Sequence, residues 1–223
     1  MCIFVNGNII KQFNMKKILT LLATLSLAVA AFGQTAEEIV SRMDAEMEKH
    51  DFDKEGLFMV VDIKLPILGS MSSKVWNLGD NMRLEAETMG VMIVTWMDAT
   101  TEWTYNSKTE ELEIENRKEN SKSNSEGDTE MFSGITEGYD VSIQKETDDA
   151  WYILCKKSKT NKEKDDPKTM NLVVTKGTYF PKSLSAKMSG VTMTMRDLRY
   201  GVTEKEVTFD PAAYPNAKVV DKR

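Results

Sequence analysis

The residue types that most often carry catalysis are scarce in this chain. His50 is the only histidine, and Cys2 and Cys155 are the only cysteines. A zinc site built on several histidines and a Cys–His nucleophilic pair are therefore both excluded. His50 follows the end of a helical pattern, and Cys155 alternates with Trp151 and Ile153 as a small buried apolar residue would. We expect neither residue to do chemistry.

Two acidic pairs have the residue type needed for general acid–base cleavage of glycosides. Glu85 and Glu87 fall on the polar side of an alternating pattern, and Asp148 and Asp149 mark a turn, so we expect solvated carboxylates. The sequence contains no G-x-S-x-G, no phosphate-binding loop and no G-x-G-x-x-G. We therefore predict a protein that is not an enzyme and uses no cofactor and no metal ion.

The N-terminal residues have the pattern of an export signal. Met15, Lys16 and Lys17 precede an apolar run over 18–31, and small residues stand at Ala31 and Gly33. A short basic region, 7–15 apolar residues and small residues at −3 and −1 are typical of secretory signals. We expect residues 1–33 to be a signal peptide with a mis-assigned upstream start, Met15 being the true one. Residues 34–223 would then form a single periplasmic domain.

Charge and composition limit the kinds of partner that the mature part, residues 34–223, could bind. Three of the 29 basic residues lie before Gln34, so 26 remain against 35 acidic ones, a balance of −9. This argues against a nucleic-acid partner. Cys155 alone cannot form an internal disulfide. Of the 15 methionines 13 remain, and methionine either fills a core or adapts to a ligand of variable shape.

Periodicity predicts one helix followed by a long series of strands. A capping box at Thr35 and Glu38 and apolar residues at helical spacing predict a helix to about His50. Alternation with a period of two then predicts strands over 57–65, 74–78, 82–87, 91–97, 102–105, 112–115, 139–145, 151–157, 170–176, 182–188 and 191–200. The predicted fold class is mainly β with α. It is a strongly curved antiparallel sheet of about 10–11 strands forming an unclosed half β-barrel, covered by an N-terminal helix and a short lid segment, with a small closed barrel as the alternative.

Two features favour a site for a long apolar ligand. The charged stretch 118–130, followed by Met131, Phe132 and Ile135, is typical of a lid over such a site. Val191, Met193 and Met195 add flexible apolar side chains to a late strand. The residues that we expect to bind lipid are Leu57, Met59, Val61, Ile63, Met82, Leu84, Met92, Val94, Trp103, Tyr105, Met131 and Phe132. The alternative is that these residues simply pack on the helix.

Several segments together resemble the LolA-like family of periplasmic lipoprotein carriers, in the superfamily of LolA, LolB and RseB. The resemblance lies in the capped helix, in W-N-L-G-D-N-M-R-L-E over 76–85, in W-T-Y-N over 103–106, and in F-D-P, Y-P and V-V-D-K-R at the C-terminus. It implies an unclosed eleven-stranded barrel with helices over its mouth and a cavity that shields acyl chains. It also implies handover from an inner-membrane transporter to an outer-membrane acceptor. An arginine on a strand holds the lid closed in such carriers. Arg83 is the nearest candidate, and its alternation with Glu85 and Glu87 puts it on the polar face.

The leading hypothesis is a soluble, monomeric periplasmic carrier that binds an acylated lipoprotein or lipid and serves outer-membrane lipoprotein sorting. A regulatory or sensor module on the same fold is one alternative. A structural envelope protein with a filled core is the other.

Overall fold

The structure, a computed structural model, describes residues 33–67, 69–118 and 134–223. The chain divides into two units, residues 1–34 and residues 35–223, and the following account concerns the second. The predicted lid residues Met131 and Phe132, like almost all of the predicted signal peptide, lie outside the described residues.

Helix α2 (Ala36–Met47) begins where the sequence predicts. The backbone N–H of Glu38 donates to the Thr35 hydroxyl over 3.2 Å, and the Glu38 carboxylate reaches back to the Thr35 N–H. These bonds satisfy two N–H groups that the first helical turn leaves free. The helix buries Ile39, Val40, Met43 and Met47 on one side. It ends three residues before His50 because Asp51 caps a further short helix, α3 (Phe52–Glu55).

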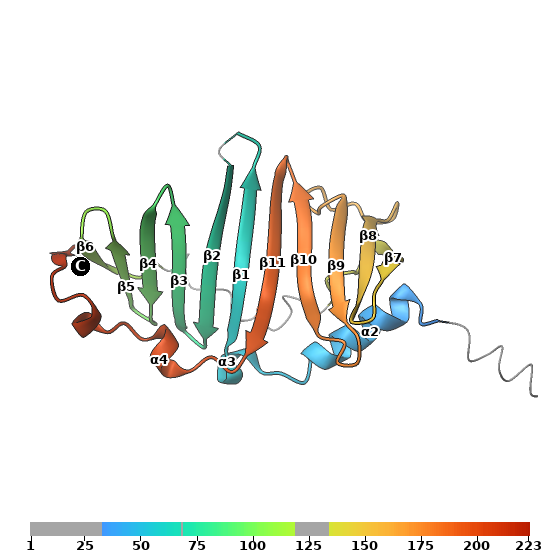
Figure 1. Ribbon diagram of the computed structural model, residues 1–223, viewed down its shortest axis with the longest axis horizontal. Helices are drawn as coiled ribbons and strands as arrows, with labels where there is room; N and C mark the ends of the chain where they lie inside the picture. Colours follow the sequence, from blue (N-terminus) through green and yellow to red (C-terminus); the bar gives the residue numbers. More distant parts are fainter. Residues whose placement is uncertain (1–32, 68, 119–133) are drawn as a thin grey trace, which may run out of the picture. The chain divides into compact units, whose positions relative to one another are not determined.

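One mixed sheet of twelve strands makes up most of the unit (Figure 1). The strands are β1 (Leu57–Leu65), β2 (Gly69–Leu78), β3 (Asn81–Thr88), β4 (Val91–Met97), β5 (Thr101–Asn106), β6 (Glu111–Asn116), β7 (Tyr139–Glu146), β8 (Ala150–Lys157), β9 (Thr169–Thr175), β10 (Pro181–Met188), β11 (Val191–Tyr200) and β12 (Lys218–Asp221). Their order is β12-β6-β5-β4-β3-β2-β1-β11-β10-β9-β8-β7. The sheet is curved and does not close, which confirms the predicted half barrel.

The C-terminal segment differs from the prediction. The sequence predicts ten to eleven strands, and the twelfth, β12, pairs in parallel with β6. It holds its place through backbone bonds such as Lys218 N–H to Glu110 O, 2.8 Å. Four residues are too few for a reliable alternation signal, so β12 depends on its partner strand. Two further short helices, α4 (Glu204–Val207) and η3 (Pro211–Ala213), precede β12.

The two halves of the sheet are covered on opposite faces. We call the face that carries Leu57 and Met59 the α2 face, because both residues belong to the core under α2. This core spans β7 to β11 and β1 and includes the fully buried Leu172. We call the other face the C-terminal face. There Phe58 and Trp76 pack with Val202 and Val207 near α4.

The C-terminal segment is a second cover of the sheet, which the sequence did not predict. On the C-terminal face the rings of Phe209 and Tyr214 cover Trp96 of β4, and they also contact Trp103 and Tyr105 of β5. The physical reason is that β2, β4 and β5 turn aromatic side chains away from α2, and the C-terminal segment supplies the rings that pack on those of β4 and β5.

Candidate functional site

An apolar row on the α2 face crosses five neighbouring strands. Strand pairing places Met71 opposite Ile63, Ile63 opposite Met193, Met193 opposite Ala186, and Ala186 opposite Met170. Residues opposite one another in a sheet share a face. The row is covered at its β9 end, where Met170 is 4% exposed, and open at β11, where Met193 is 37% exposed.

A pocket of about 250 Å³ lies along the middle of this row, around its open position at Met193. Its lining is mainly apolar and comes from the ends of β1, β10 and β11. We call it the apolar groove. It consists of Ile63, Ala186, Met188, Ser189, Val191 and Met193. Two methionine side chains border it, and their flexible thioethers can adapt to a chain of variable shape.

The apolar groove continues into the core. One row closer to α2, Val61 pairs with Met195 and Met195 pairs with Leu184. Val61 and Met195 are partly buried against the core, whereas Leu184 belongs to it. An unbroken apolar surface therefore leads from the helix-covered core to the open edge of the sheet.

The predicted lipid-binding residues divide between the two faces. Register places six of them on the α2 face and four on the C-terminal face. The first group is Leu57, Met59, Val61, Ile63, Met82 and Leu84, and the second is Met92, Val94, Trp103 and Tyr105. Leu57 and Met59 are core residues that are 3% and 6% exposed. Ile63 is the predicted residue that lines the apolar groove.

Several groove residues were missed by the sequence reasoning. Ala186 and Met188 end a strand that was predicted correctly, but their alternation with Lys187 was not read as a binding surface. Val191 and Met193 were recognised as apolar and flexible without being assigned to the site. The signal was present in the alternation, and what was lacking was the pairing of β11 with β1.

Arg83 lies on the C-terminal face among aromatic rings. Its guanidinium carbon is 5.0 Å from the Trp76 ring centre and 5.7 Å from that of Trp96, and the guanidinium also pairs with Glu85. The prediction of a polar face is therefore wrong, although Arg83 and Glu85 do share a face. Glu85 is not solvated as expected, because its side chain is 19% exposed and ion-paired. Arg83 points away from the apolar groove.

His50 and Cys155 have structural surroundings. The His50 ring stacks on Tyr200 with centres 3.9 Å apart, and its Nδ1 is 2.9 Å from a Glu55 carboxylate oxygen. Cys155 is fully buried, and this burial raises the pKa of its thiol to about 11. Within the described ranges no group of three or more His, Cys, Asp or Glu side chains has a metal-binding arrangement.

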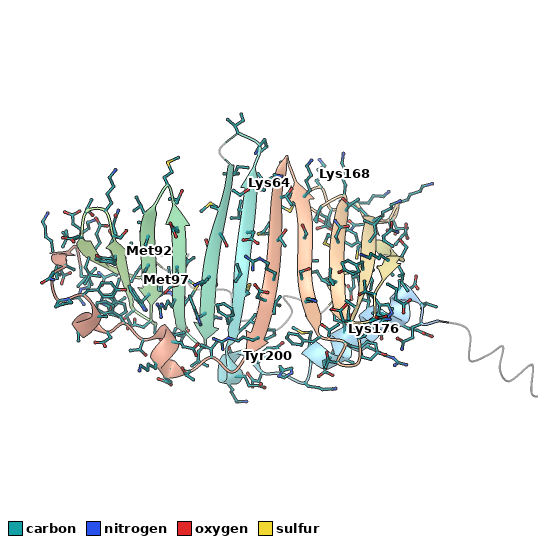
Figure 2. The ribbon with its side chains drawn as sticks, viewed as in Figure 1. Lys64, Met92, Met97, Lys168, Lys176 and Tyr200 are labelled. Atoms are coloured by element: carbon teal, nitrogen blue, oxygen red, sulfur yellow. The ribbon has the colours of Figure 1, made fainter. Side chains whose placement is uncertain are left out.

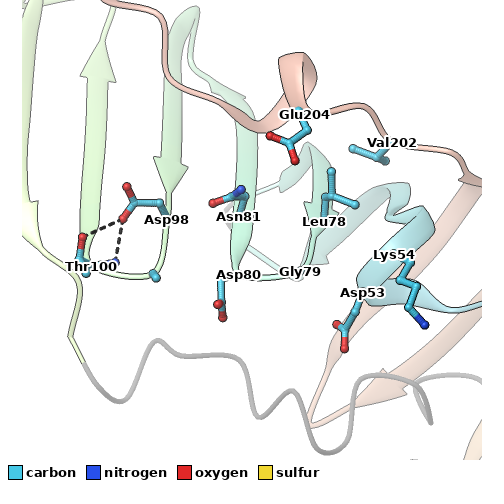
Figure 3. A pocket seen from close by; sticks show the side chains of 11 residues that line it. Asp53, Lys54, Leu78, Gly79, Asp80, Asn81, Asp98, Thr100, Val202 and Glu204 are labelled. Atoms are coloured by element: carbon cyan, nitrogen blue, oxygen red, sulfur yellow. Dashed lines mark hydrogen bonds between the residues drawn. The ribbon is translucent and has the colours of Figure 1, made fainter.

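A second hollow lies at the opposite ends of the strands from the apolar groove, between α3, α4 and the β2–β3 and β4–β5 turns (Figure 3). It measures about 680 Å³, and Asp53, Asp80, Asp98 and Glu204 line it. Asp98 accepts a hydrogen bond of 2.7 Å from the Thr100 N–H, which Figure 3 draws. An acidic lining does not suit an acyl chain, because burying carboxylates against hydrocarbon is costly.

Comparison with known proteins gives similarity of fold. No family model and no curated protein matches this sequence. Among solved structures, LprF from Mycobacterium bovis is 11% identical, with 75% of this chain and 93% of that chain covered and a TM-score of 0.51. Lipoprotein LppX from Mycobacterium tuberculosis is 11% identical over 74% and 96%, with a TM-score of 0.44. A LolA superfamily protein from Nitrosomonas europaea is 13% identical over 80% and 99%, with a TM-score of 0.29.

At such identities the likeness concerns the fold alone. At that level the predicted curved and unclosed sheet is confirmed. Among the described residues no helix is both long and apolar enough to span a membrane.

Proposed function

We propose that this protein is a periplasmic carrier that binds the acyl chain of a lipoprotein or lipid in the apolar groove and performs no covalent chemistry. The observation that carries the proposal is the apolar row that leaves the α2 core and reaches solvent at Met193. Contiguous exposed apolar surface of this kind is typical of binding sites. A hydrocarbon chain laid along the row would contact Ile63, Ala186 and Met193 and would need few directional bonds.

The energy of such a contact is sufficient for reversible binding. Each methylene group removed from water contributes about 0.8 kcal/mol. About ten methylenes would supply about 8 kcal/mol if fully buried, which corresponds to a micromolar dissociation constant, and about 4 kcal/mol if half buried, which corresponds to a millimolar one. The covered end of the row near Met170 gives the chain a direction in which to slide under α2.

The proposal also includes export of the protein to the periplasm and a role in lipoprotein sorting. The basic and apolar residues over 15–33 support a periplasmic location. The sequence resemblance to LolA-like carriers implies that an inner-membrane transporter supplies the acylated cargo and an outer-membrane acceptor receives it. We propose that the protein performs this transfer as a monomer.

The groove is tested by one pair of neighbouring variants. Met193 and Thr192 are adjacent on β11, so their side chains point to opposite faces. Met193→Glu places a carboxylate in the apolar groove and should weaken binding of a fluorescent fatty acid at least tenfold. Thr192→Glu places the same group on the C-terminal face and should change the affinity less than twofold.

Two control measurements accompany this pair. Met193 is 37% exposed, so Met193→Glu should keep its melting temperature within a few degrees of the parent protein. Native mass spectrometry of the protein purified gently from its host should show a bound lipid or acylated peptide. Equal fatty-acid affinity in both variants, or no uptake by the parent protein, contradicts the proposal.

A further inference from the structure

Exposed apolar side chains gather along one border of the sheet, where several strands end in hairpin turns. β1, β3 and β10 run in the same direction, so the turns that follow them lie at the same edge (Figure 1). A large apolar side chain is exposed in or directly before each of these turns. Ile67 is 93% exposed, Met89 is 96% exposed and Met188 is 46% exposed. We call this border of the sheet the hairpin edge, and define it by these three residues and the lysines beside them.

Met89 has an unfavourable backbone conformation as well as an exposed side chain. Met89 and Gly90 have φ angles of 52° and 76°, and Ser189 and Gly190 repeat the pattern with 48° and 87°. Two-residue hairpin turns of this type favour Asn, Asp or Gly, since other residues enter the left-handed region at a cost. A methionine there gains nothing from packing because it is almost fully exposed. Strain without compensation inside the fold favours a contact with something outside it.

Basic side chains accompany the apolar tips. Lys64 precedes the β1–β2 turn, Lys187 precedes Met188, and Lys168 lies in the loop before β9; all three are exposed. None of the three has an ion-pair partner within the part of the chain that the structure describes. Figure 2 shows Lys64 and Lys168 at the hairpin edge, and Lys176 and Tyr200 toward the opposite one. In the hollow beside the β10–β11 turn, four lysines (Lys157, Lys164, Lys168 and Lys187) outnumber two carboxylates (Asp165 and Asp166), whereas the whole chain has a net charge of −6.

We propose that the hairpin edge docks on the surface of an anionic lipid bilayer. Ile67, Met89 and Met188 enter the boundary between headgroups and acyl chains, and the three lysines contact lipid phosphates. Apolar side chains combined with lysines are the composition that binds such an interface. The tips span β3 to β10, which is four strand spacings or about 19 Å, so the contact has several separated points. Glu87 is exposed on β3 near Met89 and would be repelled by anionic lipid. We therefore expect the electrostatic attraction to be strongest at the β1–β2 and β10–β11 turns.

Docking by the hairpin edge would bring the apolar groove to the bilayer surface. Met188 belongs both to the hairpin edge and to the groove lining. A protein docked by this edge holds the groove mouth against the bilayer, so an acyl chain can pass between them with little exposure to water. This use rests on the proposed function, whereas the docking itself does not.

The apolar contribution is tested with two tip variants outside the groove. Binding of the purified protein to vesicles of equal parts phosphatidylglycerol and phosphatidylcholine is measured by flotation. Ile67→Ser combined with Met89→Asn should reduce binding at least tenfold. The melting temperature should stay the same or rise, because asparagine suits the turn better than methionine. Val219→Ser, at a residue that is 58% exposed on β12, is the matched apolar control and should bind as the parent does.

The basic contribution is tested in the same assay. Lys64→Gln combined with Lys187→Gln should weaken binding about thirtyfold, since each lysine near an anionic surface contributes about a factor of five. Lys49→Gln combined with Lys205→Gln removes equal charge at the opposite edge and should have no such effect. Raising the salt concentration should weaken binding of the parent protein, and vesicles of phosphatidylcholine alone should bind it poorly.

The outcomes separate this proposal from the acyl-binding one. The tip variants and lysine variants should keep the parent's affinity for fluorescent fatty acid in vesicle-free solution. No binding of the parent protein to anionic vesicles, or equal loss in tip variants and controls, overturns the docking proposal even if fatty-acid binding holds. Tip-dependent docking without any fatty-acid binding supports docking and contradicts the proposed function.

Discussion

The ring of Phe209 stacks on the indole of Trp103, with ring centres 5.4 Å apart and planes inclined by 16°. The two residues come from distant parts of the chain, because Trp103 is on β5 and Phe209 follows α4. The same Phe209 ring meets Trp96 edge-on at 5.3 Å. The contact shows that the C-terminal segment covers the aromatic half of the sheet in the way that α2 covers the other half.

Removing this ring should destabilise the protein without changing its acyl binding. Phe209→Ala deletes a partly buried aromatic side chain, so the free energy of unfolding should fall by about 2 kcal/mol. The measurement is urea unfolding followed by tryptophan fluorescence, to which Trp96 and Trp103 contribute two of the four indoles. Lys205→Ala, at an exposed position of α4, should leave the unfolding midpoint almost unchanged. Lower fatty-acid affinity in Phe209→Ala would show that the two faces are coupled.

Met92→Asp should have little effect on acyl binding. Register pairs Met92 with Glu87 and puts its side chain on the C-terminal face, away from the apolar groove. The new carboxylate would stand opposite Glu87, and like charges across a strand pair should lower the free energy of unfolding by about 0.5–1 kcal/mol. Affinity for fluorescent fatty acid should stay within twofold of the parent protein. A tenfold loss would assign the ligand to the C-terminal face instead.

The strands could be predicted from the sequence because alternation is a local signal. β4 and β11 have the bounds that the pattern gives, Val91–Met97 and Val191–Tyr200. The relative facing of two strands is not local. Met82 and Met92 are both apolar members of correctly predicted strands, yet pairing puts them on opposite faces. A shift of one residue in register inverts every side chain of a strand, and composition does not fix that shift.

The site was harder to predict than the fold for the same reason. The apolar groove joins the ends of β1, β10 and β11, and β1 pairs with β11 across more than a hundred residues of sequence. Ile63 was predicted from its own strand, whereas Met188 needed knowledge of its neighbours. The C-terminal cover is a similar case, since Phe209 and Tyr214 reveal their role through the rings that they meet.

The Cys155 thiol should resist alkylation in the folded protein. Its burial raises the pKa to about 11 and removes it from solvent. At pH 8 roughly one thiol in a thousand would be ionised, and the thiolate is the reactive form. Treatment with iodoacetamide followed by peptide mass spectrometry should leave Cys155 unmodified, and the same treatment in guanidinium chloride should modify it fully. Rapid modification without denaturant would indicate that β8 and its neighbours open readily.

Replacing Asp44 should change how stability depends on pH. Asp44 lies on α2, and its pKa is raised to about 6 by burial and by the nearby charges of Glu48 and Glu137. One of its carboxylate oxygens is buried without a hydrogen-bond partner among the described residues. The unfolded chain has the ordinary value of 3.8. Between about pH 4 and 6 the folded state therefore binds more protons than the unfolded state, so stability decreases as pH rises through this window.

Asp44→Asn should remove this dependence because the amide stays neutral at every pH. The variant should be more stable than the parent protein at pH 7, and the difference should shrink as the pH falls toward 4. Melting temperatures of both proteins across pH 4 to 7 measure it. Asp53→Asn, at an exposed residue of α3, is the control, and its melting temperature should change with pH as that of the parent protein does. Parallel curves for Asp44→Asn and the parent would mean that Asp44 is ionised and solvated in the folded protein, with α2 less tightly packed against β7 than the structure has it.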